Sequence, residues 1–444
     1  RFQYSESIIF NPAGIGVLDK LSKYSLNFFL LLEETSKWNF SMRERQSFYY
    51  ENINFWNSVL SSSKTDIVVF YTWPHNSSDY SLYLVAKYIL GIDVLFLDST
   101  EHFNKFYHTI GTDLENLHSP YEKKYLNKSE LKNNEDVQEC IEILTGNVHK
   151  YKRDVIEAID NAKETGFSSF LKDYMKLTLK TLYTGVGFKK APVAWKKNKK
   201  PFYKNSSKLN YFEYFFLLFK LQLKTIILKK FYESICSEPT SNEKFVFFPA
   251  PFQPEANAGN LVGHFQDVFL VMNLLNAALP SGWKIYYKEH WVTFSEGRNN
   301  KSTLIKNKEY YYRLMKYKNI KFFSHKLDSL KFIDNCEAVV TVSGTTGWEG
   351  LVRNKPTLSF GNSWYMGCKS LFNIKNLKDV KDAFSSILNG FKPDKDDVKR
   401  YMLAVASSSK KGLIHSKFFA HGNHSDQNKL IADFIFEKYC EHYK

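Results

Sequence analysis

The sequence has few cysteines, and they form no pattern. There are five in 444 residues, an odd number, and none is spaced as a pair from its neighbour. A zinc finger is excluded, and a disulfide framework is disfavoured, because both need paired cysteines at characteristic spacings. Free thiols in a reducing compartment are the simplest interpretation, and they favour a cytoplasmic protein.

Long apolar runs and internal repeats are also missing. No uncharged run reaches the roughly 20 residues that cross a bilayer, so we expect no membrane span. Arg1 is not followed by a charged and then apolar leader, so we expect no secretory signal. No repeat of solenoid length is present. The length instead suits two globular domains, each with a sizeable core.

Acidic residues are outnumbered by basic ones. Lys and Arg total 61 against 46 Asp and Glu, which gives a net charge of +15 at pH 7. This charge suits nucleotide phosphates, acidic sugars or an anionic membrane surface. Nucleic acid would also suit it. However, zinc-finger spacing, an RNA-recognition signature and a basic-region zipper are all absent, so we expect no nucleic-acid partner.

The N-terminal half contains a strand–helix–strand pattern. Residues 66–71 and 92–97 are apolar runs typical of strands, and a helical stretch lies between them from 79 to 90. This βαβ unit predicts a parallel sheet with ligand-facing loops at the carboxyl ends of its strands. His75 lies in such a loop and is a candidate for acceptor binding or proton transfer. A structural histidine beside Pro74 is the alternative.

Residues 120–235 are less informative. A charged, helix-like stretch from 120 to 185 precedes a basic loop at 189–204, in which aromatic residues lie between lysines. The segment 211–235 is rich in Phe and Leu and carries several lysines. A solvated surface and a helix packed on the core are the ordinary interpretations. Contact of 189–235 with an anionic membrane surface is the alternative.

The C-terminal half begins a second strand and helix alternation after a linker at 237–242. We therefore predict an α/β protein with two Rossmann-like domains facing a cleft. The predicted boundaries are 1–236, 243–390 and a helical tail, 391–444, that returns to the N-terminal domain. The predicted strands are 245–248, 283–287, 319–323, 338–342 and 357–360.

The most informative stretch follows the apolar run 338–342. Small residues open a helix there, where free backbone N–H groups, hydroxyls and the helix dipole favour an anion, usually phosphate. Plain helix capping is the alternative. Glu349, one turn into the helix, is either a dipole-stabilising carboxylate or an acceptor for ribose hydroxyls. The candidate phosphate-binding residues are Ser343, Gly344, Thr345 and Thr346.

Three blocks together resemble the capsule polysaccharide biosynthesis family of bacterial surface-glycan enzymes, which includes the β-Kdo transferases. Residues 247–255 (Phe-Phe-Pro-Ala-Pro-Phe-Gln-Pro-Glu) resemble its Gln-x-x-Asp or Gln-Pro-Glu signature, and 286–290 (Tyr-Tyr-Lys-Glu-His) its Lys-x-His-Pro turn. Residues 341–361, followed by Trp364-Tyr365, resemble its Ser-Gly-Thr-x-Gly-Trp-Glu element. Trp291 replaces the family's Pro, and the sequence has Asn-Lys-Pro where Gly-Lys-Pro is usual.

The resemblance implies a GT-B glycosyltransferase that moves Kdo from CMP-Kdo to a surface polysaccharide or its lipid-linked precursor. Neither a metal nor a cofactor beyond the nucleotide sugar is expected, and the acceptor is a glycan or glycolipid at the inner face of the membrane. Alternatives keep the fold with another donor, such as a CMP-nonulosonate or a UDP-hexose, or make the chain a non-catalytic assembly partner.

The resemblance also implies roles for individual residues. Glu255 is the expected catalytic carboxylate, as nucleophile if the anomer is retained or as base if it is inverted. A capping carboxylate is its alternative. Gln253 and Lys288 join residues 343–346 and Glu349 as donor-binding residues. Lys288 and His290 are expected to add positive charge, and His290 joins Glu255 and His75 in the catalytic set.

Overall fold

The computed structural model describes residues 11–35, 40–70, 72–98, 106–111, 114, 125, 211–240, 242–253, 262–294, 302–411 and 424–443. Helices are expected between residues 120 and 185, but of these residues the structure describes Tyr125 alone. The basic loop 189–204 also lies outside the described residues. The domain boundaries stay a prediction.

The N-terminal half supplies the following elements: α1 (Ile15–Leu21), α2 (Ser25–Thr35), α3 (Met42–Ser62), β1 (Ile67–Phe70), α4 (Ser77–Leu84), a π-helical turn (Val85–Leu90), β2 (Asp93–Asp98), β3 (Phe106–Gly111) and α9 (Tyr211–Ser234). The C-terminal half supplies β4 (Phe245–Pro249), α10 (Val268–Ala278), β5 (Lys284–Lys288), α11 (Ser302–Ile305), α12 (Lys308–Met315), β6 (Ile320–Phe323), α13 (Ser329–Asn335), β7 (Ala338–Thr341), α14 (Thr346–Val352), β8 (Thr357–Ser359), β9 (Leu371–Asn373), α15 (Leu377–Leu388), α16 (Lys395–Ser408), β10 (Ser409–Lys411) and α17 (His424–Tyr443).

The described N-terminal sheet has the order β1-β2-β3-β10. β1 and β2 are parallel, as the βαβ pattern predicted, and the connecting helix ends at Gly91 with φ 65°. β3 is antiparallel to β2, which the expectation of a parallel sheet did not include. The reason lies in the connection: residues 99–105 are too few for the crossover that parallel strands need. β10, from the C-terminal tail, pairs antiparallel with β3.

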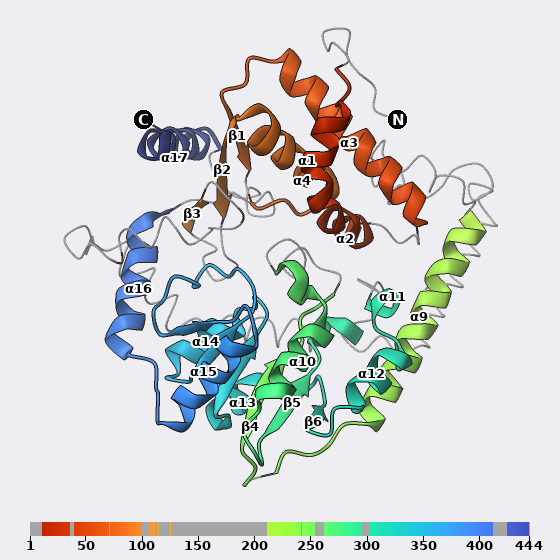
Figure 1. Cartoon of the computed structure of the whole chain (residues 1–444), viewed down its shortest axis with the longest axis vertical. Helices are drawn as coiled ribbons and strands as arrows, with labels where there is room; N and C mark the ends of the chain where they lie inside the picture. Colours follow the sequence, from red (N-terminus) through yellow and green to blue (C-terminus); the bar gives the residue numbers. More distant parts are fainter. Residues whose placement is uncertain are drawn as a thin grey trace.

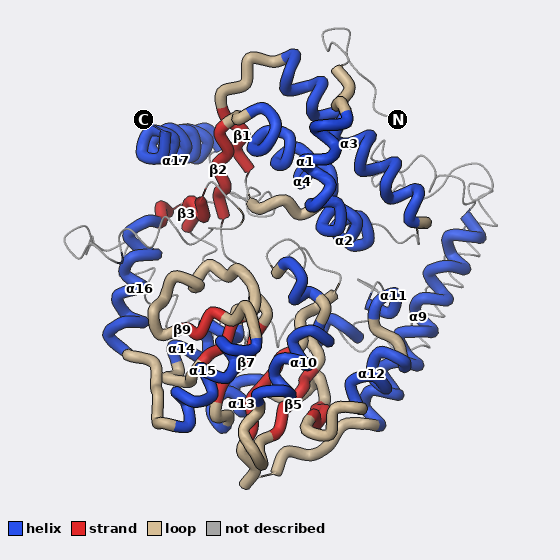
Figure 2. The backbone as a smooth tube through the Cα atoms, in the orientation of Figure 1, coloured by secondary structure: helices blue, strands red, loops and turns tan. Residues whose placement is uncertain are grey.

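The C-terminal sheet is parallel throughout, with the order β6-β5-β4-β7-β8-β9. In chain order this is 3-2-1-4-5-6, the strand order of the Rossmann fold. The chain builds outward from β4 through β5 and β6, and then returns to the other side of β4 with β7. The predicted α/β class is confirmed, and Figure 2 shows these strands surrounded by helices.

Alternate residues of β4 serve two different cores. Phe247 packs on one face of the sheet, where its ring stacks on Phe332 of α13 with centroids 5.1 Å apart. Val246 and Phe248 belong to the main core on the other face, together with Leu275 of α10. Burial on both faces explains why this strand is a continuous apolar run rather than an alternating one.

The two halves make direct contacts. Asn362, just after β8, donates from its side chain to the carbonyl of Leu114 at 3.1 Å, and Tyr125 donates to the Asp397 carboxylate. In Figure 1, α9 runs along one side of the molecule and α16 along the other. α17 lies beside β1 and β2, where Phe434 packs on Leu95 and Leu97. Among the described helices, none is both long and apolar enough to span a membrane.

Candidate functional site

The candidate residues gather at one edge of the C-terminal sheet. β4, β5 and β7 are neighbouring parallel strands, so their carboxyl ends open onto the same edge. Gln253 follows β4, Lys288 ends β5, and Ser343 follows β7. The chain changes its direction of growth between β4 and β7, and crevices at such switch points are where open α/β sheets bind ligands.

The turn after β7 is held in place from two sides. The backbone N–H of Gly344 donates to Oγ1 of Thr341 at 2.9 Å, and the Tyr365 hydroxyl donates to the carbonyl of Gly344 at 2.5 Å. Thr345 makes no side-chain capping bond to α14. Ser343 and Thr346 are half-buried, whereas Gly344 and Thr345 are exposed. The turn is thus fixed by its surroundings, with part of its surface open to solvent.

Glu349 lies in the first turn of α14, where an acidic side chain complements the helix dipole. Its side chain is buried, with 8% exposed. Both sequence interpretations placed Glu349 at this position in the helix. Its burial favours the dipole-stabilising interpretation, because a carboxylate that accepts hydrogen bonds from ribose hydroxyls must be accessible to the nucleotide.

The glycines of the 343–350 motif allow close packing. A Cβ at Gly347 would lie 2.3 Å from the Tyr365 hydroxyl oxygen, and one at Gly350 would lie 2.7 Å from Oγ1 of Thr357. α14 therefore approaches β7 and β8 more closely than side chains at these positions would allow. At Gly361, a Cβ would lie 2.8 Å from the Val342 carbonyl oxygen, so the ends of β7 and β8 also meet closely.

Lys288 and His290 have different environments. Lys288 is buried, with 7% exposed, and its Nζ donates to Oγ of Ser329 at 3.1 Å. His290 is exposed, and its Nδ1 accepts from the backbone N–H of Val292 at 3.3 Å, which leaves the proton of a neutral ring on Nε2. Desolvation by densely packed neighbours, and then the charges of Lys288 and Lys306, lower the pKa of His290. A lowered pKa favours the neutral ring, which offers a hydrogen-bond donor rather than the expected positive charge.

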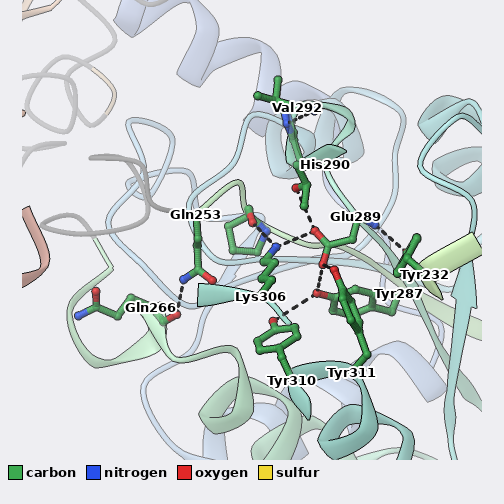
Figure 3. Close-up of polar contacts among 12 residues, drawn as sticks. Tyr232, Gln253, Gln266, Tyr287, Glu289, His290, Val292, Lys306, Tyr310 and Tyr311 are labelled. Carbon is green, nitrogen blue, oxygen red and sulfur yellow. Dashed lines mark hydrogen bonds and ion pairs between the residues drawn. The ribbon is translucent and has the colours of Figure 1, made fainter. Parts of the chain in front are cut away.

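Between these two residues, Glu289 is the centre of a buried polar cluster that Figure 3 shows. Its Oε1 accepts from the hydroxyls of Tyr287 at 2.7 Å and Tyr311 at 3.0 Å, and its Oε2 accepts from Thr293 at 3.1 Å. Lys306 Nζ lies 2.6 Å from Oε2, and both charged side chains are 0% exposed. Removing one member of such a pair typically costs about 3–5 kcal/mol.

Tyr287 and Tyr311 act as donors to the Glu289 carboxylate. Burial first, and then the Glu289 charge, raise the pKa values of Tyr287 and Tyr311 well above the ordinary value. Tyr232, with its pKa raised for the same reasons, accepts from the backbone N–H of Glu289 at 3.0 Å. Sequence reasoning missed the cluster because Glu289 stands at the variable position of Lys-x-His. The available signal was Glu289 itself, because a charged residue directly after a buried strand needs a buried partner.

Gln253 is buried after β4, and its side-chain amide donates to the carbonyl of Gln266 at 2.6 Å. Glu255, the expected catalytic carboxylate, lies outside the described residues. His75 follows β1 in the N-terminal sheet. Its Nδ1 bonds the Trp73 carbonyl at 2.6 Å, and its ring stacks on the Trp73 ring with centroids 5.4 Å apart. These local contacts fit the structural alternative for His75.

No three His, Cys, Asp or Glu side chains within the described ranges lie close enough together to hold a metal ion. Fold and site together define an α/β protein of Rossmann type with a candidate ligand site at its switch point. Residues 264–371 match the family model described as Capsule polysaccharide biosynthesis protein. The resemblance predicted from the motifs is therefore confirmed over this range, which contains the second and third blocks and begins after the first.

Comparison with other proteins gives weaker similarities. No protein with a curated description matches the sequence. The β-Kdo 2,7 transferase of Thermosulfurimonas dismutans KpsC is 14% identical to this chain, with a TM-score of 0.23. The β-Kdo 2,4 transferase of the same KpsC is 15% identical, with a TM-score of 0.27. The matches cover 45% and 44% of this chain, and 67% and 57% of those chains. The UDP-GlcNAc 2-epimerase of Methanocaldococcus jannaschii is 14% identical over 86% of this chain and 93% of its own, with a TM-score of 0.28. Similarities of this size assign neither donor nor acceptor.

Proposed function

We propose that this protein is a glycosyltransferase that transfers Kdo from CMP-Kdo to a bacterial surface polysaccharide or its lipid-linked precursor, without a metal ion. The observation that carries the proposal is the coincidence of family match and geometry. The matched range 264–371 includes Lys288, His290 and the Ser343–Thr346 turn, and the fold brings these residues to neighbouring strand ends at the switch point.

Release of CMP leaves negative charge on one phosphate. We assign its binding to the N–H groups of Thr345 and Thr346 and to the hydroxyls of the 343–346 turn, since the Gly344 N–H already donates to Oγ1 of Thr341. The bond from Tyr365 to Gly344 keeps the turn in one geometry. Donors fixed before the reaction stabilise developing charge without reorganisation. Lys288 adds positive charge nearby, and neutral His290 offers Nε2–H as a donor to the phosphate or the Kdo carboxylate.

Glu255 is the proposed catalytic carboxylate, two residues beyond Gln253. It acts as nucleophile if the anomeric configuration is retained, and as base toward the acceptor hydroxyl if it is inverted. His75, after β1, is proposed on the acceptor side, where a glycan or glycolipid binds. Because its Nδ1 is bonded to the Trp73 carbonyl at 2.6 Å, we assign that role to Nε2.

A lipid-linked acceptor requires access to a membrane, and α9 has a surface that suits one. Among the side chains that the structure describes there, from residue 219 on, the exposed ones are Lys220, Leu223, Lys224, Ile227, Lys230 and Ser234. Leu223 is 39% and Ile227 47% exposed between the lysines, a mixture that suits an anionic lipid surface. Sedimentation with anionic liposomes tests this part. Equal recovery with neutral and anionic liposomes would remove it.

The catalytic assignment is tested with Glu255→Gln. We expect transfer of Kdo from CMP-Kdo to fall at least about a hundredfold, because a group that takes part in bond making is lost. CMP binding should stay within about threefold, since the phosphate turn is intact. The matched control is Glu243→Gln, whose carboxylate lies before β4 at the opposite end of the strands and pairs with Lys321 at 2.8 Å. Undiminished transfer by Glu255→Gln would overturn the assignment.

A further inference from the structure

The loop after β4 has few backbone bonds available to hold it. Pro249, which ends β4, and Pro251, in the loop, carry no N–H, so neither can donate to a neighbouring strand. The described loop is fixed instead by three bonds. Ala250 N–H donates to the Lys288 carbonyl at 2.8 Å, Gln253 donates to Gln266, and Lys306 Nζ donates to the Pro251 carbonyl at 3.1 Å.

Lys306 joins this loop to the neighbouring one. The same ammonium group that bonds the Pro251 carbonyl after β4 is paired with Glu289 after β5. His290 follows Glu289 directly, and its ring centroid lies 6.0 Å from that of Phe252, the residue after Pro251. One buried cation thus contacts both loops that carry candidate site residues. Its backbone N–H donates to the Ser302 carbonyl at 2.7 Å, which fixes the cation's own position after α11.

We propose that Lys306 is a positioning residue for sugar transfer: it holds the Pro251 carbonyl, and so sets the Gln253 loop against His290. Glu289 serves mainly to keep the buried ammonium group paired. This inference rests on the proposed glycosyltransferase function. It assigns to Lys306 a role that neither the motifs nor the family match contains.

A purely structural role of the Glu289–Lys306 pair and a positioning role of Lys306 predict different activities for the single variants. If the Glu289–Lys306 pair only stabilises the fold, both single variants should affect activity in proportion to their loss of stability. If Lys306 positions the loop, Glu289→Gln should keep most activity, because the amine of Lys306 still reaches the Pro251 carbonyl. Lys306→Met should lose activity, because methionine has no donor to replace that bond.

The experiment compares Lys306→Met, Glu289→Gln and the double variant in the full chain. The double variant removes both charges and should have a higher unfolding temperature than Lys306→Met, since no unpaired carboxylate stays buried. We expect kcat to fall at least tenfold in the double variant and in Lys306→Met, and less than threefold in Glu289→Gln. CMP affinity should change less than threefold in all three, because Lys306 does not contact the 343–346 turn. This split between kcat and binding is not expected of a general packing defect.

The matched control is the double variant Glu243→Gln/Lys321→Met. It has the same chemistry, including a tyrosine hydroxyl from β5 on the carboxylate, but lies at the other end of the strands. Its kcat should stay within twofold of wild type. A folded Glu289→Gln/Lys306→Met protein with wild-type kcat would overturn the inference, as would a Glu289→Gln protein that loses as much kcat as Lys306→Met.

If wild-type protein transfers no sugar, the proposed function fails, and a crystal structure of the double variant then tests the inference by itself. Displacement of the Pro251 carbonyl relative to His290 supports it, and an unmoved loop overturns it.

Discussion

Tyr365 donates its hydroxyl to the carbonyl oxygen of Gly344 at 2.5 Å, and so ties a residue beyond β8 to the turn after β7. The two residues are 21 positions apart, and their bond closes the motif that the sequence shows as two separate pieces. In our account, this bond keeps the phosphate-binding turn in a single geometry.

Tyr365→Phe is therefore expected to weaken CMP binding by roughly tenfold, which corresponds to the loss of about one hydrogen bond. The fold should lose only about 1 kcal/mol, because the ring still fills its buried site. Calorimetric titration and denaturant unfolding measure the two quantities. Tyr317→Phe is the matched control, because Tyr317 donates at 2.5 Å to Asn273, outside the site. Equal CMP affinity in both variants would contradict the role given to Tyr365.

Gly347→Ala is expected to destabilise the protein by about 1–3 kcal/mol. The added Cβ would lie 2.3 Å from the Tyr365 hydroxyl and 2.7 Å from Cγ2 of Thr341, so α14 must move away from β7. Denaturant unfolding measures the change. Gly16→Ala in α1, with nothing within 4 Å of its Cβ, should shift stability by less than about 0.5 kcal/mol. A Gly347→Ala protein as stable as wild type would show that the close approach is not needed.

His290 is expected to titrate below pH 6.5 and to be neutral at pH 7. Desolvation opposes its charged form, and Lys288 and Lys306 oppose it further. Because the unfolded state then binds more protons, the contribution of His290 to stability is complete above pH 6.5 and is lost as the pH falls below it. NMR titration of the ring measures the pKa, and Lys288→Met should raise it. A wild-type pKa at or above 6.5 would contradict this prediction.

Asp397→Asn is expected to cost about 1–3 kcal/mol of stability. The buried carboxylate accepts from the Ser370 backbone at 2.9 Å, from the Ser370 hydroxyl at 2.7 Å and from Tyr125. The amide of an asparagine would place its own N–H donors against some of these donor groups, and two donors cannot form a hydrogen bond with each other. Asp396→Asn, an exposed neighbour in the same turn of α16, should stay within about 0.5 kcal/mol. Equal effects of the two substitutions would contradict a specific role for Asp397.

The parts of the fold that follow from local pattern could be predicted from the sequence. β7 and α14 follow from an apolar run and the small residues after it, and the βαβ pairing of β1 with β2 follows from two runs around a helical stretch. The orientation of β3 did not follow, because the predicted pattern stopped at residue 97. The strand order of the C-terminal sheet was left open, because it depends on side-to-side contacts between distant segments.

The candidate site also has a part that could be predicted from the sequence and a part that could not. The positions after β4, β5 and β7 were recognisable from motifs, because each motif lies within a few residues of a strand end. Lys306 was not, since it lies 17 residues from Glu289 and belongs to no motif. Tyr125 and Asp397 are 272 residues apart, and nothing in either local sequence indicates that they meet. Tertiary packing determines which polar residues of this kind become partners, and the hydrophobic periodicity of the sequence carries no information about such long-range contacts.

The most direct test of the account is calorimetric titration of the purified protein with CMP, UDP, GDP and ADP in the presence of a chelator. We predict that CMP binds selectively, and that its affinity falls when Ser343 is replaced by Ala, because the turn then loses a hydroxyl for the phosphate. Preference for UDP or GDP, or binding of none of the four nucleotides, would contradict a CMP-Kdo-dependent transferase.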